Sequence, residues 1–178
     1  TVSFWVRYKS TGSKQVFLYG GLGTNTTFGM STNNSTTQTL INYQETPNLF
    51  SIFQHTDNPI YYSLNTNDDD AWVHYTITAD ASSTKIYKNG VLLGSNNISL
   101  ATNGNELRFG LEFFQSNTAA NKHFLLDDFK VYDVVLTPAQ IKQQYADEVA
   151  FSDTNLVAYY GFENDLTCAN DPQFNLKA

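Results

Sequence analysis

The chain has 178 residues, a formal net charge of −7 and a sequence pI near 4.7. This acidic balance disfavours nucleic acid and anionic membranes as partners, because no stripe of Lys and Arg is present to neutralise phosphates. No apolar run approaches the roughly 20 residues that a membrane-spanning helix needs, so we expect no membrane insertion.

The first predicted element is a strand over residues 1–8. Apolar and polar positions alternate there with a period of two, which is typical of a strand with one buried face. Phe4 falls in the apolar phase, whereas Trp5 and Arg7 fall in the polar phase. Because the chain begins inside this strand, we expect it to be a piece of a longer secreted protein.

Short strands continue along the chain at a spacing of about ten residues, which is typical of a β-sandwich or barrel. They are predicted over residues 14–19, 27–31, 39–43, 49–54, 60–64, 72–79, 85–88, 91–95, 106–113 and 124–132. Asn89 and Gly90 separate two of these strands. This pair indicates a tight hairpin, because a type I′ turn needs a positive φ at both central positions.

One helix is predicted after the last of these strands. Thr137 supplies an N-cap, Pro138 stands at the first helical position, and Gln140 completes a capping box. We expect a helix of about two turns that ends near Asp147 and closes one end of the sandwich. The tail then begins a new strand over residues 156–162.

Three motifs in this order resemble the concanavalin A-like lectin/glucanase superfamily, specifically its laminin G-like and pentraxin-like jelly rolls. They are the opening TVSFWVRY strand, the WVHY strand leading into KIYKNGVLL, and the closing LDDFKVY strand followed by LTPAQI. The closing motif is the most specific of the three. The resemblance implies an all-β fold, a two-sheet antiparallel jelly-roll sandwich with one short C-terminal helix.

The resemblance also divides the chain. Residues 1–149 correspond to a laminin G-like jelly roll that lacks its usual first strands. Residues 150–178 form a tail whose LVAYYGF segment resembles the strand that opens such a domain. Either the tail begins a second tandem repeat, or it supplies the missing edge strand to this copy or a neighbouring one. An open sheet edge is a template for pairing, so self-association through strand 156–162 is an open alternative.

Five residues are candidates for ligand binding. Trp5 and Arg7 on one strand and Trp72 and His74 on another fall outside the core phase. If these faces form the concave side of the jelly roll, they offer a platform for the apolar face of a sugar. The alternative is that the tryptophans pack under loops. Tyr62 is a further candidate near a loop.

Acidic residues near the closing strand are candidates for a metal site. Asp127 shares its strand phase with Phe129, so simple alternation points its carboxylate towards the apolar side, where it needs a hydrogen bond or a metal ion. Many domains of the resembled family bind Ca²⁺. The candidate ligands are Asp127, Asp128, Glu163, Asn164 and Asp165. The alternative is that Asp127 caps backbone amides and Asp128 is solvated.

Two features bear on the cellular compartment. Cys168 is the one cysteine, so it is either a buried thiol or paired with sequence outside these residues. Sequons for N-glycosylation occur at Asn25, Asn33, Asn34 and Asn97. They would accept glycans if a eukaryotic cell secretes the protein, although chance explains many sequons in a chain so rich in Asn and Thr.

The sequence contains no catalytic motif. The E-x-D-x-x-E pattern of the superfamily's glucanases is missing, as are H-E-x-x-H and G-x-S-x-G, so we expect no enzyme. We expect a secreted or cell-surface adhesion module that binds a glycan or an extracellular protein, with Ca²⁺ as a candidate cofactor. The alternatives are a structural subunit of an extracellular assembly or filament joined by strand exchange, and an accessory domain of a polysaccharide-degrading enzyme.

Overall fold

The computed structural model describes part of the chain. The described residues are 1–8, 15–20, 39–45, 48–54, 60–63, 70–97, 107–109, 124–147 and 153–171. Among them, no helix is both long enough and apolar enough to cross a membrane. The chain divides into two compact units, each with one sheet, and we describe each unit by itself.

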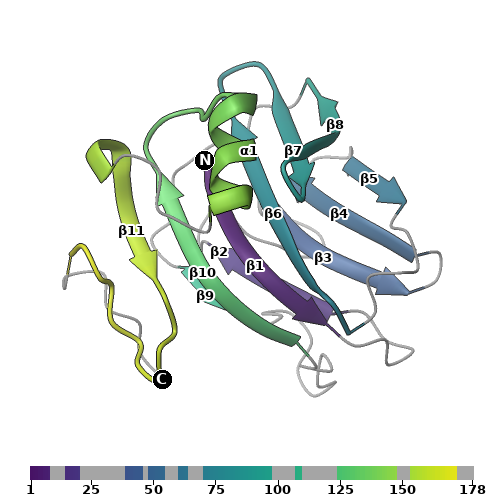
Figure 1. Cartoon of the computed structure of the whole chain (residues 1–178). Coiled ribbons are helices and arrows are strands. Elements are labelled where there is room, and N and C mark those ends of the chain that lie inside the picture. Colours follow the sequence, from purple (N-terminus) through teal and green to yellow (C-terminus); the bar gives the residue numbers. More distant parts are fainter. Residues whose placement is uncertain are drawn as a thin grey trace. The chain divides into compact units, whose positions relative to one another are not determined.

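The first unit contains a six-stranded sheet. Its strands are β1 (Val2–Tyr8), β6 (Trp72–Ala79), β7 (Thr84–Lys88), β8 (Val91–Asn96), β10 (Phe124–Tyr132) and β11 (Leu156–Tyr160). They lie in the order β11-β10-β1-β6-β7-β8 (Figure 1). The pairs β1–β6, β6–β7, β7–β8 and β10–β11 are antiparallel.

The second unit contains a five-stranded antiparallel sheet in the order β5-β4-β3-β2-β9. Its strands are β2 (Gln15–Gly20), β3 (Thr39–Glu45), β4 (Asn48–Gln54), β5 (Ile60–Ser63) and β9 (Leu107–Phe109). The strand predicted over residues 27–31 lies outside the described residues. The two sheets confirm the predicted fold class, an all-β jelly-roll sandwich with one short α-helix in the described part.

Large aromatic side chains form the core on one face of the six-stranded sheet. Phe4, Tyr75 and Phe129 are fully buried, and they come from β1, β6 and β10. The ring of Phe4 lies 6.2 Å from that of Tyr75 and 6.1 Å from that of Phe129, which is within the range of favourable aromatic contacts. The period-two pattern of β1 is therefore confirmed as a core face and an opposite, outer face.

The hairpin between β7 and β8 has the predicted turn. Asn89 has a φ of 50° and Gly90 a φ of 76°, as a type I′ turn requires. The side chain of Asn89 also fixes the turn to the neighbouring strand. Asn89 Oδ1 accepts a hydrogen bond from the backbone N of His74 at 2.9 Å, and the backbone N of Asn89 donates to the carbonyl oxygen of His74 at 2.8 Å.

The helix α1 (Pro138–Asp147) begins with the predicted capping box. The backbone N of Gln140 donates to Thr137 Oγ1 at 3.3 Å, and the backbone N of Thr137 donates to Gln140 Oε1 at 2.8 Å. The predicted position of the helix was wrong. It does not close one end of a sandwich, because α1 lies over the strands β1 and β6 of the six-stranded sheet (Figure 1). Its Tyr145 packs against Trp5 and His74 on the outer face of this sheet.

An apolar cluster holds α1 on this outer face. Ile141 is fully buried with Leu136 and with two tyrosines of the sheet, Tyr87 and Tyr132. The helix also approaches the β7–β8 turn, where a Cβ added to Gly90 would lie 3.2 Å from the Cα of Lys142. The helix thus contacts the sheet in two places: through its apolar side and at the β7–β8 turn.

The strand of the tail, β11, belongs to the same sheet in this structure. It pairs with β10 in the register Phe129↔Tyr160 and Lys130↔Tyr159. The following segment covers part of β11, since Asn170 Nδ2 donates to the carbonyl oxygens of residues 156 and 157 at 2.9 and 3.0 Å. Cys168 is buried beside it, and its Sγ donates to Asn170 Oδ1 at 3.3 Å. The domain division and strand exchange between copies stay predictions.

Candidate functional site

Four predicted ligand-binding residues lie on the outer face of the six-stranded sheet. In the register of β1 and β6, Trp5 is paired with His74, and Arg7 is paired with Trp72. Directly paired residues of antiparallel strands point to the same side of a sheet. All four side chains therefore lie on the face opposite Phe4, and α1 covers part of that face.

His74 is not accessible to a ligand. Its side chain is 2% exposed, and its ring lies 5.1 Å from Trp5 and 6.0 Å from Tyr145. The ring Nε2 is 3.0 Å from Ser3 Oγ. Burial, together with a smaller effect of the charge of Lys130, lowers the pKa of His74 to about 4. The imidazole is thus a neutral packing element under the helix, and the interpretation of His74 as a ligand contact is wrong for this structure.

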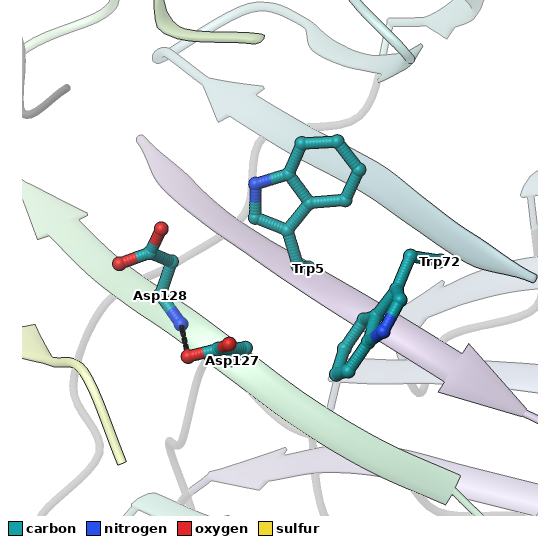
Figure 2. Close-up of a pocket in the computed structure, with 4 residues that line it drawn as sticks. All are labelled: Trp5, Trp72, Asp127 and Asp128. Carbon is teal, nitrogen blue, oxygen red and sulfur yellow. Dashed lines mark hydrogen bonds between the residues drawn. The ribbon is translucent and has the colours of Figure 1, made fainter. Parts of the chain in front are cut away.

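Two of the other outer-face residues, Trp5 and Trp72, line a pocket, whereas Arg7 is not among its described lining residues. A cavity of about 240 Å³ is lined by Trp5, Trp72, Asp127 and Asp128, all within the first unit. Figure 2 shows these side chains rising from three neighbouring strands, β6, β1 and β10. The Trp72 side chain is the most open of them, with 40% of its surface exposed. We call this site the tryptophan pocket.

A left-handed residue within the strand β10 brings both aspartates into the pocket. Asp128 has a φ of 49°, in the left-handed region that Asp tolerates better than most residues. Its backbone N donates to Asp127 Oδ1 at 2.8 Å. The expected alternation, which pointed Asp127 towards the apolar side with Phe129, is therefore wrong, because this conformation interrupts the period of two at Asp128.

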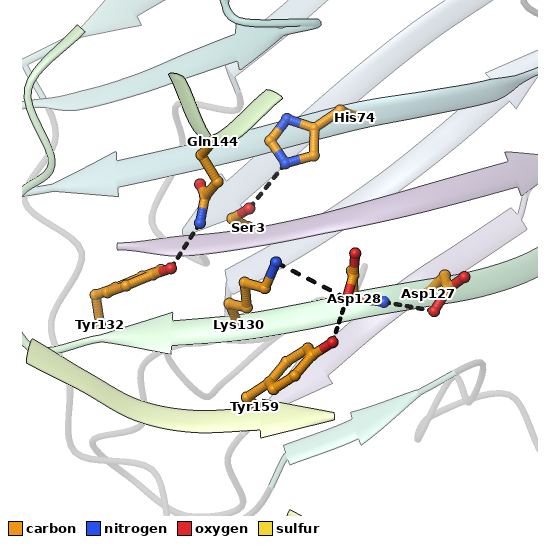
Figure 3. A network of polar contacts seen from close by, with 8 residues as sticks. All are labelled: Ser3, His74, Asp127, Asp128, Lys130, Tyr132, Gln144 and Tyr159. Carbon is orange, nitrogen blue, oxygen red and sulfur yellow. Dashed lines mark hydrogen bonds and ion pairs between the residues drawn. The ribbon is translucent and has the colours of Figure 1, made fainter. Parts of the chain in front are cut away.

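Two side chains that the sequence did not indicate interact with the carboxylate of Asp128. Tyr159 of β11 donates its hydroxyl to Asp128 Oδ1 at 2.6 Å, and Lys130 Nζ lies 3.8 Å from the same oxygen (Figure 3). The Lys130 side chain is buried, with Nζ 5.1 Å from the ring centroid of Tyr159. Burial raises the pKa of Tyr159, and the hydrogen bond to Asp128 raises it further, so the phenol stays protonated and able to donate.

The predicted calcium ligands do not come together. Asp165 Oδ1 already accepts hydrogen bonds from Thr167 N at 3.0 Å and Thr167 Oγ1 at 2.8 Å. Glu163 and Asn164 are exposed in the same turn. In the described part of the chain, no three His, Cys, Asp or Glu side chains are grouped to hold a metal ion. These residues therefore do not fit one calcium site, and calcium binding stays a prediction.

The remaining predicted sites are only partly described. Asn97 is exposed just after β8, as an accepting sequon requires. Asn25, Asn33 and Asn34 lie outside the described residues. Tyr62 belongs to β5, but its side chain is outside the described part.

Solved structures with the same fold include three of different kinds. A proposed carbohydrate binding protein from Bacteroides ovatus aligns with a TM-score of 0.64 and 12% identity, over 90% of this chain and 44% of that one. The receptor binding domain of botulinum neurotoxin type G has a TM-score of 0.60 and 16% identity, over 83% and 37%. A Trypanosoma rangeli sialidase has a TM-score of 0.60 and 10% identity, over 83% and 22%.

At these identities the structural similarity concerns the fold, and the chain spans less than half of each solved structure. None of the curated proteins compared with the chain shows significant sequence similarity. A laminin G-like family model, described as the concanavalin A-like lectin/glucanases superfamily, matches residues 1–142. Because this match covers most of the chain, the protein belongs to the concanavalin A-like lectin/glucanase superfamily, as the three sequence motifs predicted.

Proposed function

We propose that the protein is a non-catalytic module that binds glycans in the tryptophan pocket. One observation carries the proposal: two indoles and two carboxylates, from three neighbouring strands, line a single cavity. The volume of about 240 Å³ is below the ~300–1,000 Å³ of pockets that enclose drug-sized ligands, so the pocket suits one sugar ring of a longer glycan.

The lining matches the two surfaces of a sugar. The apolar C–H face of a pyranose packs on an aromatic ring, and both Trp5 and Trp72 line the pocket. Carboxylates accept hydrogen bonds from sugar hydroxyls, and such charge-assisted bonds are stronger than neutral ones. Asp128 is already fixed by Tyr159, so it offers a preorganised acceptor.

The same carboxylates are poorly arranged for hydrolysis. Glycosidases place two carboxyl groups on opposite sides of the scissile bond. Asp127 and Asp128 are consecutive residues of β10, so they approach the pocket from one side (Figure 2). A binding role is also in keeping with the Bacteroides ovatus and botulinum neurotoxin structures, whose descriptions name carbohydrate and receptor binding. One fold hosts many functions, so this similarity is only supporting evidence.

We further propose a secreted or cell-surface setting, in which the module directs a larger protein to glycans. The chain spans 22–44% of the three solved structures described above, so such modules occur within longer chains. In this setting the exposed Asn97 would be open to glycosylation.

Glycan-array screening followed by calorimetry tests the proposal. We expect Trp72→Ala to weaken the best glycan about tenfold or more, because truncated tryptophans at binding sites commonly lose this much affinity. Trp72 is the better choice than Trp5, whose ring also packs on Tyr145. Leu92→Ala is the matched control, since Leu92 is 50% exposed on β8 and does not line the pocket. Equal affinities of the two variants for the glycan would contradict the proposal.

A further inference from the structure

The two carboxylates of the tryptophan pocket differ in how their charge is balanced. Asp128 has a cationic neighbour in Lys130 and a hydrogen bond from Tyr159. Asp127 is half-buried, and the hydrogen bond described for it comes from the uncharged backbone N of Asp128. No ion pair of Asp127 is found within the described part of the chain. Among the described residues, the negative charge of Asp127 therefore has no matching cation.

Two basic side chains of the neighbouring strands are not among the described residues that line the pocket. Lys130 is buried beside Tyr159 and does not line the pocket. Arg7 is paired with Trp72 in the strand register, but it is not among the described lining residues either. The described lining thus consists of two aromatic faces and two anionic groups.

This combination favours a positively charged ligand group. The face of an indole attracts a cation, and tryptophan does so more strongly than the other aromatic residues. A half-buried carboxylate beside it is stabilised by a partner of opposite charge. Conversely, a sugar carrying a carboxylate or sulfate would meet the unbalanced charge of Asp127, in a protein with a net charge of −7, and would bind more weakly.

We propose that the tryptophan pocket selects an amino sugar with a free ammonium group, of the glucosamine type, which would sit against the indoles with its nitrogen near Asp127. This inference rests on the proposed glycan-binding function and names the ligand class for the same pocket. An N-acetylated sugar of the same ring would lose the cation and keep the stacking. The positive charge on the sugar nitrogen is therefore the feature that should determine the affinity for the pocket.

A matched pair of ligands tests this inference. Calorimetry at low salt and mildly acidic pH compares a glucosamine tetrasaccharide with the corresponding N-acetylglucosamine tetrasaccharide. We expect the free amine to be preferred about tenfold, which is the size of a cation–π contact combined with an ion pair in a partly open site. The preference should shrink as salt is added, because screening weakens exposed charges.

Asp127→Asn is the informative variant. Asparagine keeps the oxygen that accepts from Asp128 N, so the left-handed conformation of Asp128 should remain while the charge of Asp127 is lost. We expect this variant to lose most of the preference for the free amine, while the contact of the ammonium group with the indoles leaves a smaller one. Asp133→Asn removes the same charge from an exposed residue after β10 and should leave the preference intact. If Asp127→Asn does not fold, Asp127→Ser takes its place, since serine also keeps a side-chain oxygen and removes the charge.

The outcomes separate the two proposals. Equal affinity for both tetrasaccharides, lost in Trp72→Ala, overturns the amino-sugar inference and leaves glycan binding intact. Binding of no glycan at all overturns both. A preference that Asp127→Asn leaves undiminished, or that Asp133→Asn reduces equally, shows only long-range attraction and contradicts the inference. Tetralysine bound as tightly as the glucosamine tetrasaccharide contradicts the assignment to a sugar.

Discussion

His74 makes the stability of this protein depend on pH in a defined direction. The pKa of His74 is about 4 in the folded protein, against 6.5 for an ordinary histidine, mainly because the ring is buried. Between pH 6.5 and 4, His74 is therefore protonated in the unfolded chain but neutral in the folded protein. Stability is retained above pH 6.5 and falls as the pH drops through this interval. One pKa unit corresponds to about 1.4 kcal/mol, so the loss by pH 4 is about 3 kcal/mol.

A variant without the imidazole isolates this contribution. Carboxylates and other histidines also titrate in the same interval, so the useful quantity is the difference between wild type and His74→Gln. Urea unfolding at pH 7, 6, 5 and 4 gives the free energy of unfolding of each protein. We expect the wild type to lose about 3 kcal/mol more than the variant between pH 7 and 4. Parallel curves for the two proteins would refute the burial of His74 under α1.

Three other substitutions test how the first unit is held together, each by the free energy of urea unfolding at pH 7. Gly90→Ala places a side chain at a φ of 76° and 3.2 Å from the Cα of Lys142, so we expect a loss of about 1–2 kcal/mol or more; an unchanged value would contradict the turn geometry. Thr137→Ala removes the helix N-cap and should cost about 1 kcal/mol, whereas no loss would argue against the capping box. Phe4→Ala empties a fully buried site and should cost about 3–5 kcal/mol, and a loss below about 1 kcal/mol would place Phe4 outside the core.

Local sequence signals predicted the elements of the fold well. The strands β6 and β10 have the predicted bounds, and the turn at Asn89 has the expected positive φ. The helix begins at Pro138 after its Thr137 cap. These features depend on residues close together in the chain, where alternation, turn chemistry and capping act directly.

Features that depend on tertiary contacts could not be predicted in the same way. The pairing of Tyr159 with Asp128 joins residues 31 positions apart, and no local pattern indicates it. The left-handed conformation of Asp128 interrupts a strand that simple alternation describes as regular. The same limitation explains the error about α1, because the sequence shows the apolar side of a helix but not the surface that Ile141 packs against.

The sequence placed Trp5 and Trp72 on the correct face, yet it could not define the pocket. Their position follows from period two in β1 and β6, which both strands keep. The other half of the lining comes from β10, which is next to β1 in the sheet but more than a hundred residues away in the chain. Strand order of this kind is a property of the whole fold.

The two indole N–H groups report on the central claim directly, because Trp5 and Trp72 are the two tryptophans of the chain and both line the pocket. Titration of the ¹⁵N-labelled protein with a glycan that binds it should shift both indole signals, with one shared saturation curve. Saturable binding of the glycan while both indole signals stay unchanged would place its site elsewhere and contradict the account.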